Sequence, residues 1–206
     1  MNGNTLTVNK DFYKKYMEVF LRQNSKLNLV SQNDEKFLWE KHIYDSLAIG
    51  FFLKKTGFIP KKLLDIGTGG GFPAIPIALA YPEIDVYALD SVRKKINAIE
   101  IIKQELKIEN LHTICNRAED LNEKFDLITS RAAASLKILC GYALPLLNNG
   151  GYLVAYKSRK AKEEIKDAEI ILKKFNAKIA DIIVYELPIE EIYTRNLIVI
   201  ELLVKT

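Results

Sequence analysis

The feature that most constrains this chain is a glycine-rich turn that follows a short apolar segment. Residues 63–73 read LLDIGTGGGFP, with four glycines in five positions after an apolar run that carries one acidic residue. Glycine has no Cβ and adopts positive φ readily, so such a turn lets a ligand approach bare backbone. A helix that begins here adds free N–H groups and the positive end of its dipole. The segment therefore predicts a strand, a turn and a helix that bind a nucleotide-type cofactor.

Strand-like and helix-like segments alternate through the rest of the chain after residue 61. The predicted strands are residues 62–66, 85–90, 111–116, 125–130, 150–157, 179–186 and 197–204, and the predicted helices are 73–80, 92–106, 135–147 and 161–175. Repeated strand–helix units form a parallel sheet with helices on both faces. The last two strands have no helix between them, which predicts an antiparallel hairpin at one edge. We therefore expect an α/β, Rossmann-like fold with a seven-stranded, mostly parallel sheet.

The first sixty residues are predicted to be helical and to form an extension of that sheet domain. Aromatic residues recur there at helical spacing, and Asn9 or Asp11 is suited to cap the first helix. A second helix is expected over residues 34–55. We therefore divide the chain into a basic helical extension, residues 1–60, and an α/β domain, residues 61–206.

Charge is distributed unevenly between these two parts. Residues 1–62 contain eleven Lys/Arg and six Asp/Glu, whereas residues 63–206 contain nineteen and twenty. The basic excess of the N-terminal third is either a solvated helical surface or a contact surface for a polyanion such as RNA.

Several features of the composition indicate a cytoplasmic protein. No run of about eighteen apolar residues is present, so no membrane span is expected. The first five residues, MNGNT, lack the basic-then-apolar order of a signal peptide. Cys115 and Cys140 each lie in an apolar stretch, which predicts reduced core residues and neither a disulfide nor a metal site.

The spacing of the glycines bears on which cofactor is bound. A dinucleotide-binding fingerprint has glycines at the first, third and sixth positions, and this chain has Gly67, Gly69 and then Phe72 at the sixth. A nicotinamide cofactor is therefore disfavoured, and the terminal hairpin also departs from a simple dinucleotide-binding domain. The glycines alone leave the identity of the cofactor open.

Two acidic positions narrow that choice. Asp90 lies 25 residues after Asp65, at the end of the second predicted strand, where a carboxylate can accept both ribose hydroxyls of a nucleoside. Residues 118–120, AED, follow the third predicted strand and are suited to contact an adenine edge. S-Adenosylmethionine needs these features and carries no pyrophosphate. The alternatives are a helix-capping role for Asp90 and an ordinary surface turn at residues 118–120.

Residues 63–76, LLDIGTGGGFPAIP, resemble the first motif of the RsmG (GidB) family, which methylates guanine N7 in bacterial small-subunit ribosomal RNA. The proline-containing exit, FPAIP, is more distinctive than the glycines. The resemblance continues in family order through the rest of the chain, in residues 28–31, 41–47, 89–95, 117–119, 125–136 and 195–200. The chain departs from the family pattern with Lys41 in place of arginine, Ser158 in place of glycine and Asn196 in place of histidine.

The resemblance implies a class I S-adenosylmethionine-dependent methyltransferase acting on 16S rRNA, in the 530 loop. It implies a monomer that works on the RNA or on the small ribosomal subunit, without a metal or a membrane. It assigns cofactor binding to Gly67, Gly69, Phe72, Asp90, Ser91, Val92, Ala118, Glu119 and Arg131. Arg131 is placed at the junction of cofactor and substrate.

The residues after the fourth predicted strand agree with methylation at a ring nitrogen. Enzymes that methylate an exocyclic amine commonly have an Asn/Asp-Pro-Pro-aromatic motif there, and this chain has SRAA at residues 130–133. Methylation at pyrimidine C5 needs a cysteine nucleophile, for which Cys140 is poorly placed in an apolar helix. Guanine N7 has an in-plane lone pair, so positioning can carry the rate and no general base is expected.

Arg131 is the main candidate for that positioning, because a guanidinium suits a carboxylate, a base edge or a phosphate. The alternative for Arg131 is an ion pair with a carboxylate such as Asp126 or Glu100. Lys157 and Arg195 are candidates for contacts to RNA, or are solvated charges at strand ends. His42 and Asp45 are predicted to share a hydrogen bond with a structural role.

Three other functions remain as alternatives at this stage. They are a methyltransferase acting on a small molecule or a protein, a nicotinamide-dependent oxidoreductase and a non-catalytic RNA-binding module. A basic surface gathered on one face favours an RNA substrate over a small molecule or a protein. Preferential binding of S-adenosylmethionine over NADH excludes the oxidoreductase.

Overall fold

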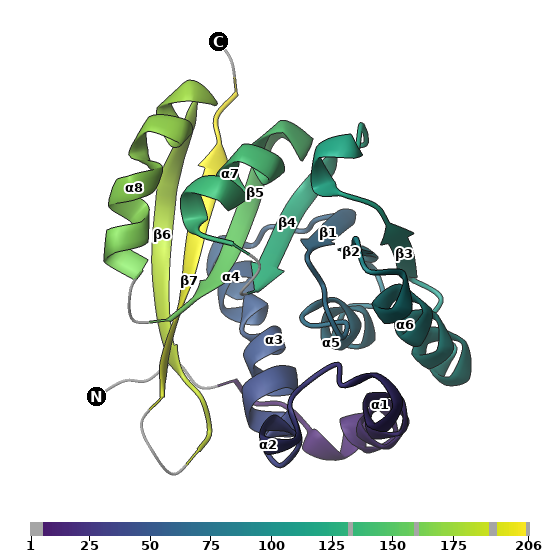
Figure 1. Ribbon diagram of the computed structural model, residues 1–206. Coiled ribbons are helices and arrows are strands. Elements are labelled where there is room, and N and C mark those ends of the chain that lie inside the picture. Colours follow the sequence, from purple (N-terminus) through teal and green to yellow (C-terminus); the bar gives the residue numbers. More distant parts are fainter. Residues whose placement is uncertain (1–5, 132–133, 159–160, 190–192, 205–206) are drawn as a thin grey trace.

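A seven-stranded sheet of order β3-β2-β1-β4-β5-β7-β6 forms the centre of this computed structural model, which describes residues 6–131, 134–158, 161–189 and 193–204 (Figure 1). The strands are β1 Lys62–Ile66, β2 Asp85–Asp90, β3 Leu111–Cys115, β4 Phe125–Arg131, β5 Leu147–Lys157, β6 Ala177–Glu186 and β7 Thr194–Leu202. Strands β1 to β5 pair in parallel, and β7 pairs antiparallel with both β5 and β6. The predicted mostly parallel sheet with a C-terminal hairpin is therefore confirmed.

Successive residues of the central strands point to opposite faces of the sheet, and both faces are buried. Leu63 and Leu127 belong to one apolar core, and Leu64 and Ile128 belong to the other. The first core packs against α1 Lys14–Leu27, α4 Ile49–Thr56, α5 Ala74–Ala80 and α6 Arg93–Leu106. The second packs against α7 Leu136–Ala143 and α8 Ala161–Lys174. This layering explains why the strands read as nearly continuous apolar runs.

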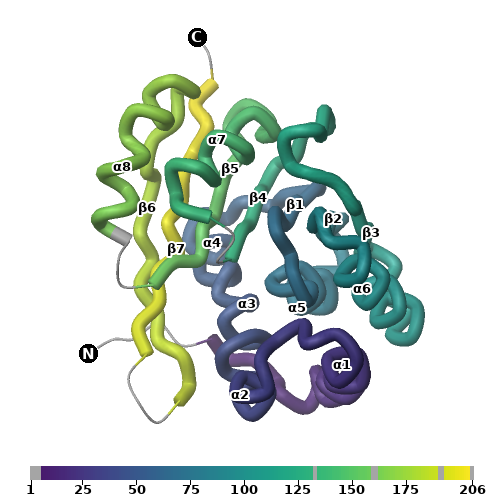
Figure 2. The backbone as a smooth tube through the Cα atoms, viewed as in Figure 1, coloured from purple at the N-terminus to yellow at the C-terminus, as the bar shows by residue number. Residues whose placement is uncertain are grey.

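The N-terminal helices pack on the first face of the sheet and pass beneath the carboxyl ends of the parallel strands (Figure 2). The 3₁₀-helix η1 Lys10–Tyr13 begins with the predicted cap, since the Asn9 side chain accepts a hydrogen bond from Asp11 N at 3.0 Å. On α1, Phe20 packs against Phe72 of the glycine-rich turn, with 5.0 Å between ring centroids. The helices thus share one core with the sheet, and the division at residue 60 remains a proposal.

The single helix predicted over residues 34–55 is wrong, because this segment is broken into four pieces. They are α2 Gln32–Glu35, the π-helix η2 Leu38–Tyr44, α3 Asp45–Leu47 and α4. Side chains take up backbone acceptors at the break: Arg131 donates to the Lys41 carbonyl, and Ser46 Oγ donates to the His42 carbonyl. Such tertiary bonds override local helix propensity, and π-helical turns often occur at functional sites.

Two other boundaries differ from expectation. The helix predicted over residues 135–147 ends at Ala143, and a 3₁₀-turn with Pro145 follows, because proline lacks the N–H that a continuing helix requires. The strand predicted over residues 150–157 begins earlier, at Leu147, and includes a register shift where Gly150 has a φ of 78°. The remaining elements lie where they were predicted, with ends moved by a few residues.

Residues 1–5 and Ala132–Ala133, which the sequence analysis used, lie outside the described residues. Within the described part of the chain, none of the helices has the length and apolar character needed to cross a membrane.

Candidate active site

A cavity of about 210 Å³ opens at the carboxyl ends of β1 and β2, beside the glycine-rich turn. We call it the glycine-loop pocket. Its lining residues are Ile66, Gly67, Leu89, Asp90, Ser91, Asn116, Arg117, Ala118, Glu119, Ala134, Leu139 and Tyr142. Ligands of open α/β sheets bind at this edge, where the loops that follow the strands converge.

The first half of the glycine-rich turn has an open backbone face. Gly67 and Gly69 have φ values of 71° and 58°, which are left-handed conformations that favour glycine. The nearest atom to a Cβ built at Gly69 is the Gly67 carbonyl oxygen, 4.0 Å away. A side chain at Gly69 would therefore meet open space, and Gly67 lines the glycine-loop pocket.

The second half of the turn uses its glycines for packing. A Cβ at Gly70 would lie 3.1 Å from Leu29 Cβ, and a Cβ at Gly71 would overlap the Ile75 side chain. Gly70 therefore lets the N-terminal region approach the turn, and Gly71 lets α5 begin close to it. The four glycines thus serve two different purposes, which their spacing alone does not distinguish.

Asp90, the last residue of β2, orients the backbone around the pocket. One carboxylate oxygen accepts a hydrogen bond from Gly69 N at 3.0 Å and the other from Val92 N at 2.9 Å. The side chain is 8% exposed, and the Lys95 ammonium lies 3.7 Å away. Since a carboxylate has about four acceptor sites, Asp90 keeps capacity for donors of a ligand. The expected helix-capping alternative is met only in part, because Asp90 accepts from the N–H of Val92, the residue before α6, and not from the first turn of the helix.

The chemistry of the pocket wall suits a nucleoside. Ile66, Leu89 and Leu139 supply apolar surface, and Tyr142 supplies an aromatic ring. The carboxylate of Asp90 suits the hydroxyl donors of a ribose.

The predicted cofactor residues fall into three groups. Gly67, Asp90, Ser91, Ala118 and Glu119 line the glycine-loop pocket. Gly69 and Val92 border the pocket, since the N–H group of each donates a hydrogen bond to Asp90. Phe72 and Arg131 lie in a neighbouring pocket instead.

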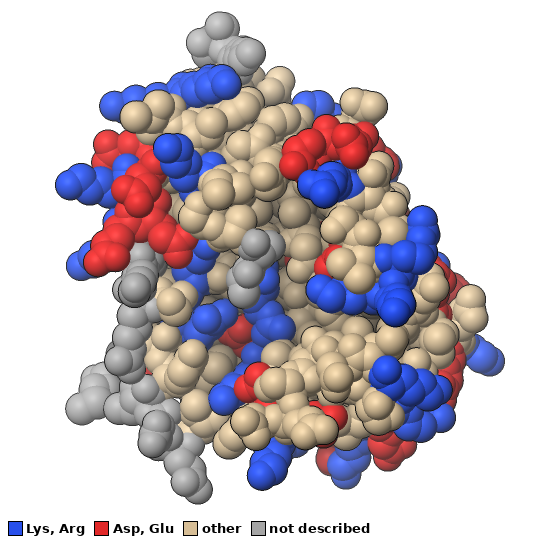
Figure 3. Space-filling view, in the orientation of Figure 1, with Lys and Arg blue, Asp and Glu red and all other residues tan. Residues whose placement is uncertain are grey.

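This second cavity, of about 270 Å³, lies on the far side of the glycine-rich turn. We call it the arginine pocket. It is lined by Asp34, Lys41, His42, Asp45, Phe72, Arg131, Leu187, Tyr193 and Arg195. It brings together the N-terminal helices, the end of β4 and the β6–β7 hairpin. In the space-filling view, basic side chains surround a hollow with acidic atoms at its base (Figure 3).

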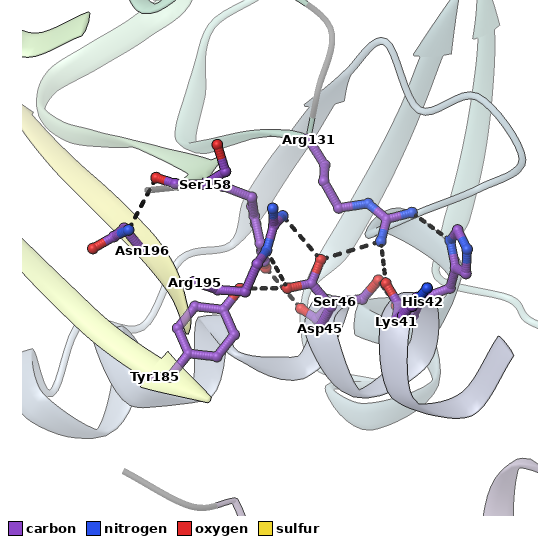
Figure 4. A network of polar contacts seen from close by, with 10 residues as sticks. Lys41, His42, Asp45, Ser46, Arg131, Ser158, Tyr185, Arg195 and Asn196 are labelled. Atoms are coloured by element: carbon purple, nitrogen blue, oxygen red, sulfur yellow. Dashed lines mark hydrogen bonds and ion pairs between the residues drawn. The ribbon is translucent and has the colours of Figure 1, made fainter. Parts of the chain in front are cut away.

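A buried carboxylate joins the two arginines of this pocket (Figure 4). Arg195 donates to Asp45 in a bidentate arrangement, Nε to Oδ1 and Nη2 to Oδ2, both at 3.1 Å. Arg131 Nη1 donates to Oδ2 at 3.2 Å, and Tyr185 Oη donates to Oδ1 at 2.5 Å. Asp45 is 2% exposed, and its charge raises the pKa of Arg195 against the opposing effect of burial. Both guanidiniums are therefore cationic and fixed.

Arg131 is tied to the N-terminal helices at two further points. It donates to the Lys41 carbonyl at 2.8 Å and to His42 Nδ1 at 2.9 Å, and its Cζ lies 5.2 Å from the centroid of the Phe72 ring. The expected alternative, an ion pair with a carboxylate such as Asp126 or Glu100, is realised with a different partner, Asp45. The hydrogen bond predicted between His42 and Asp45 is also replaced, since both side chains bond to Arg131.

His42 is neutral in this arrangement. Burial, followed by the charge of Arg131, lowers its pKa to about 4. Because Nδ1 accepts from a guanidinium, the ring proton sits on Nε2, which is buried without a partner among the described residues. His42 therefore orients Arg131 and cannot take a proton through Nδ1 without breaking that contact.

His42 should make stability depend on pH. Its folded pKa of about 4 lies below the ordinary histidine pKa of 6.5, so folding disfavours the protonated ring. The contribution is complete above about pH 6.5 and is lost as the pH falls towards 4, by up to about 3 kcal/mol. Urea unfolding across this range should show a steeper loss for the parent than for His42→Gln. The control is His112→Gln, at the only other histidine, which is exposed. Parallel pH profiles for the parent and His42→Gln would contradict this assignment.

Lys157, at the end of β5, lies apart from both pockets. Its ammonium contacts the Ala134 carbonyl at 2.6 Å and Glu164 at 2.7 Å, and the side chain is 9% exposed. Glu164 also accepts from Leu136 N, so this pair joins β5 to the starts of α7 and α8. The description of Lys157 as a solvated strand-end charge is wrong, and a contact with RNA stays an untested prediction.

Cys140 has no role as a nucleophile. It is fully buried, and burial raises the pKa of its thiol to about 12. Its place in an apolar helix predicts the same, a thiol poorly placed to act as a nucleophile.

Sequence reasoning missed Tyr142, which lines the glycine-loop pocket, and the central position of Asp45 in the arginine pocket. A signal for Asp45 was present, because residues 43–49 read IYDSLAI and a carboxylate inside an apolar segment requires buried partners. Nothing local in the sequence identified Arg195 and Tyr185 as those partners.

Residues 9–192 match the family model described as rRNA small subunit methyltransferase G (GidB). The chain is 36% identical over 197 residues to the ribosomal RNA small subunit methyltransferase G of Staphylococcus epidermidis, covering 93% of this chain and 81% of the relative. It is 33% identical over 194 residues to the enzyme of the same name from Listeria monocytogenes, covering 91% and 80%.

Solved structures resemble the fold at lower identity. The magnesium protoporphyrin IX methyltransferase of Synechocystis, solved with bound S-adenosylmethionine, aligns with a TM-score of 0.64 at 16% identity, over 96% of this chain and 99% of that one. A ribosomal protein L11 methylase from Lactobacillus delbrueckii aligns with a TM-score of 0.57 at 20% identity, over 77% and 78%. At these identities the likeness concerns the fold alone.

Proposed function

Because this chain belongs to the rRNA small subunit methyltransferase G family, and is therefore an S-adenosylmethionine-dependent enzyme that methylates a guanine of 16S rRNA, we propose that its two pockets divide the reactants between them. The glycine-loop pocket holds the cofactor, and the arginine pocket holds the target guanine. The target atom is N7, and the guanine belongs to the 530 loop.

The adjacency of the two pockets is the observation that carries this proposal. The glycine-rich turn contributes Gly67 to one pocket and Phe72 to the other. The chain does the same at the end of β4, with Arg131, the last residue of that strand, in the arginine pocket and Ala134 in the glycine-loop pocket. Reactants bound in the two pockets would meet across these two shared segments, as transfer of a methyl group requires.

We assign cofactor binding to the residues of the glycine-loop pocket and its border. Asp90 accepts the ribose hydroxyls, with Ser91 and Val92 beside it, and Ala118 and Glu119 face the adenine. Gly67 and Gly69 give the ligand access to bare backbone. Three observations fit such a ligand: the open face of Gly69, the free acceptor sites of Asp90 and the apolar walls. When bound, S-adenosylmethionine supplies an electrophilic methyl group.

The chain's own residues then act by positioning. Guanine presents N7 and O6 as neighbouring acceptors, so donors placed on O6 leave the N7 lone pair free to attack. Arg131 and Arg195 supply such donors, and Phe72 lines the same pocket. Attack by the N7 lone pair needs no general base. The two candidate bases are also occupied, since His42 is neutral with Nδ1 already bonded and Asp45 is bonded to two cations.

We place the RNA backbone against the basic N-terminal part of the chain. The side chains of Lys15, Lys26 and Lys36 are exposed there, whereas Lys41 pairs with Asp34 at 3.5 Å. Recognition would then be mainly electrostatic and shape-based. We further propose that residues 1–60 act as an RNA-contacting extension of a methyltransferase domain, residues 61–206, in a cytoplasmic monomer.

Mass spectrometry of 16S rRNA tests the target atom. Cells that lack this protein should lose one 7-methylguanosine within the 530 loop, and a plasmid carrying the parent gene should restore it. A plasmid carrying Asp90→Ala is the matched control and should not restore it. A 7-methylguanosine content that does not change between these strains would rule out N7 as the target.

A further inference from the structure

The Asp45 carboxylate has no acceptor site left for a ligand. Oδ1 accepts from Tyr185 Oη and Arg195 Nε, and Oδ2 accepts from Arg195 Nη2 and Arg131 Nη1. A carboxylate offers about four acceptor sites, and these four donors fill them. Asp45 therefore acts on whatever enters the pocket only through the groups that it holds.

Both guanidiniums keep free donors beside this carboxylate. In the described contacts, Arg195 uses Nε and one N–H of Nη2, and Arg131 uses Nη1 and one N–H of Nη2. A guanidinium has five N–H groups in a rigid fork, so each arginine retains part of its fork on the side that lines the pocket. The orientation of the free donors is set by the donors that are already bonded.

The carboxylate holds together three segments that are far apart in the sequence. Asp45 begins α3, Arg131 ends β4 and Arg195 lies near the start of β7, separated from Asp45 by 86 and 150 residues. The π-helix η2 ends directly before Asp45 and supplies the Lys41 carbonyl and His42 Nδ1 to Arg131. Arg131 and Arg195 carry like charges and repel each other, and their bonds to the shared Asp45 carboxylate hold them side by side against that repulsion.

We propose that Asp45 is the positioning residue of the substrate pocket, which sets the mutual orientation of Arg131 and Arg195 towards the target guanine and its phosphate. This inference rests on the proposed function of the arginine pocket. The competing role is that of a simple counter-charge, which lowers the positive potential of the pocket. The two roles predict effects of opposite sign when the charge is removed.

Asp45→Asn separates them. An amide of the same size cannot accept four donors, so the guanidiniums lose their fixed orientation while the pocket gains a positive charge. For a positioning residue, kcat/KM for 16S rRNA should fall on the order of 100-fold, the scale of a misplaced binding group, although RNA binding becomes no weaker in low salt. For a counter-charge, RNA should bind more tightly with a steeper salt dependence, and turnover should be retained; that result would overturn the proposal.

The matched control is Asp181→Asn. It makes the same change of charge on β6, where Asp181 forms a surface ion pair with Lys55. It should leave kcat/KM at the parental value. Calorimetric affinity for S-adenosylmethionine should be parental in Asp45→Asn, which shows that the fold and the glycine-loop pocket are intact.

A second variant covers the case in which Asp45→Asn does not fold. Arg195→Lys keeps the charge but cannot meet both carboxylate oxygens, and it should reduce kcat/KM in the same way. Parental turnover of Arg195→Lys would overturn the proposal.

Exchange of the Arg195 Nε proton, followed by NMR in protein without RNA, is the readout independent of substrate. It should be slow in the parent and faster in Asp45→Asn, and slow exchange in both would also overturn the proposal. Lack of methylation by the parent enzyme itself would instead count against the proposed function.

Discussion

Asp90→Ala is expected to weaken the binding of S-adenosylmethionine by a factor of about 100 to 10,000. The carboxylate would lose two hydrogen bonds to ribose hydroxyls, each worth about 1.5–3 kcal/mol when one partner is charged. The variant would also release the Gly69 and Val92 N–H groups, which the two carboxylate oxygens now hold. Without these two bonds, the backbone of the glycine-rich turn would be held less rigidly beside the ligand.

Calorimetry with S-adenosylmethionine measures this effect directly. Asp90→Asn should lie between the parent and Asp90→Ala, because its amide oxygen can still accept one of the two backbone N–H groups. The matched control is Asp85→Ala, at the opposite end of the same strand, where the carboxylate contacts only the exposed His112 in the described contacts. Asp85→Ala should bind the cofactor like the parent. An Asp90→Ala protein with parental affinity would remove Asp90 from the ribose site.

The glycine-loop pocket was largely predictable because its parts are local in the sequence. A strand, a turn that needs positive φ and a helix lie within twenty residues, and the acidic residue at the end of the next strand arrives at the same edge through the parallel topology. The pattern that identifies Gly67, Gly69 and Asp90 is thus the pattern that positions them. The packing role of Gly70 was not predictable in this way, because its neighbour Leu29 lies about forty residues earlier in the chain.

The arginine pocket was predictable only as separate residues. Arg131 and Arg195 were recognised as candidates, but the bond that joins each of them to Asp45 crosses 86 and 150 residues. No local periodicity encodes such a contact. The π-helix before Asp45 was missed for a related reason, since the bonds at the break in the helix include one to Arg131 on β4. Helical spacing in residues 34–55 correctly predicted helical structure, but it did not predict that the helix is broken into separate pieces.

Arg131→Lys is expected to reduce kcat for 16S rRNA about 100-fold while retaining the positive charge. A lysine ammonium cannot donate simultaneously to the Lys41 carbonyl, Asp45 and His42 in the planar arrangement that the guanidinium makes. The remaining fork would no longer face the pocket at a fixed angle. Single-turnover methyl transfer to 16S rRNA at saturating cofactor measures the chemical step without product release.

The three possible ligands of Arg131 give different results in this variant. If Arg131 holds a phosphate, the loss should be small and confined to the affinity for RNA, with the salt dependence retained, because lysine also binds phosphate. If it holds the cofactor carboxylate, calorimetry should show weaker binding of S-adenosylmethionine. If it holds the guanine edge, kcat should fall while both affinities stay parental. The third result is expected, because the side chain lines the arginine pocket and every bond it makes there is to α3 or to the π-helix before it. Parental turnover in Arg131→Lys would show that charge alone suffices at this position.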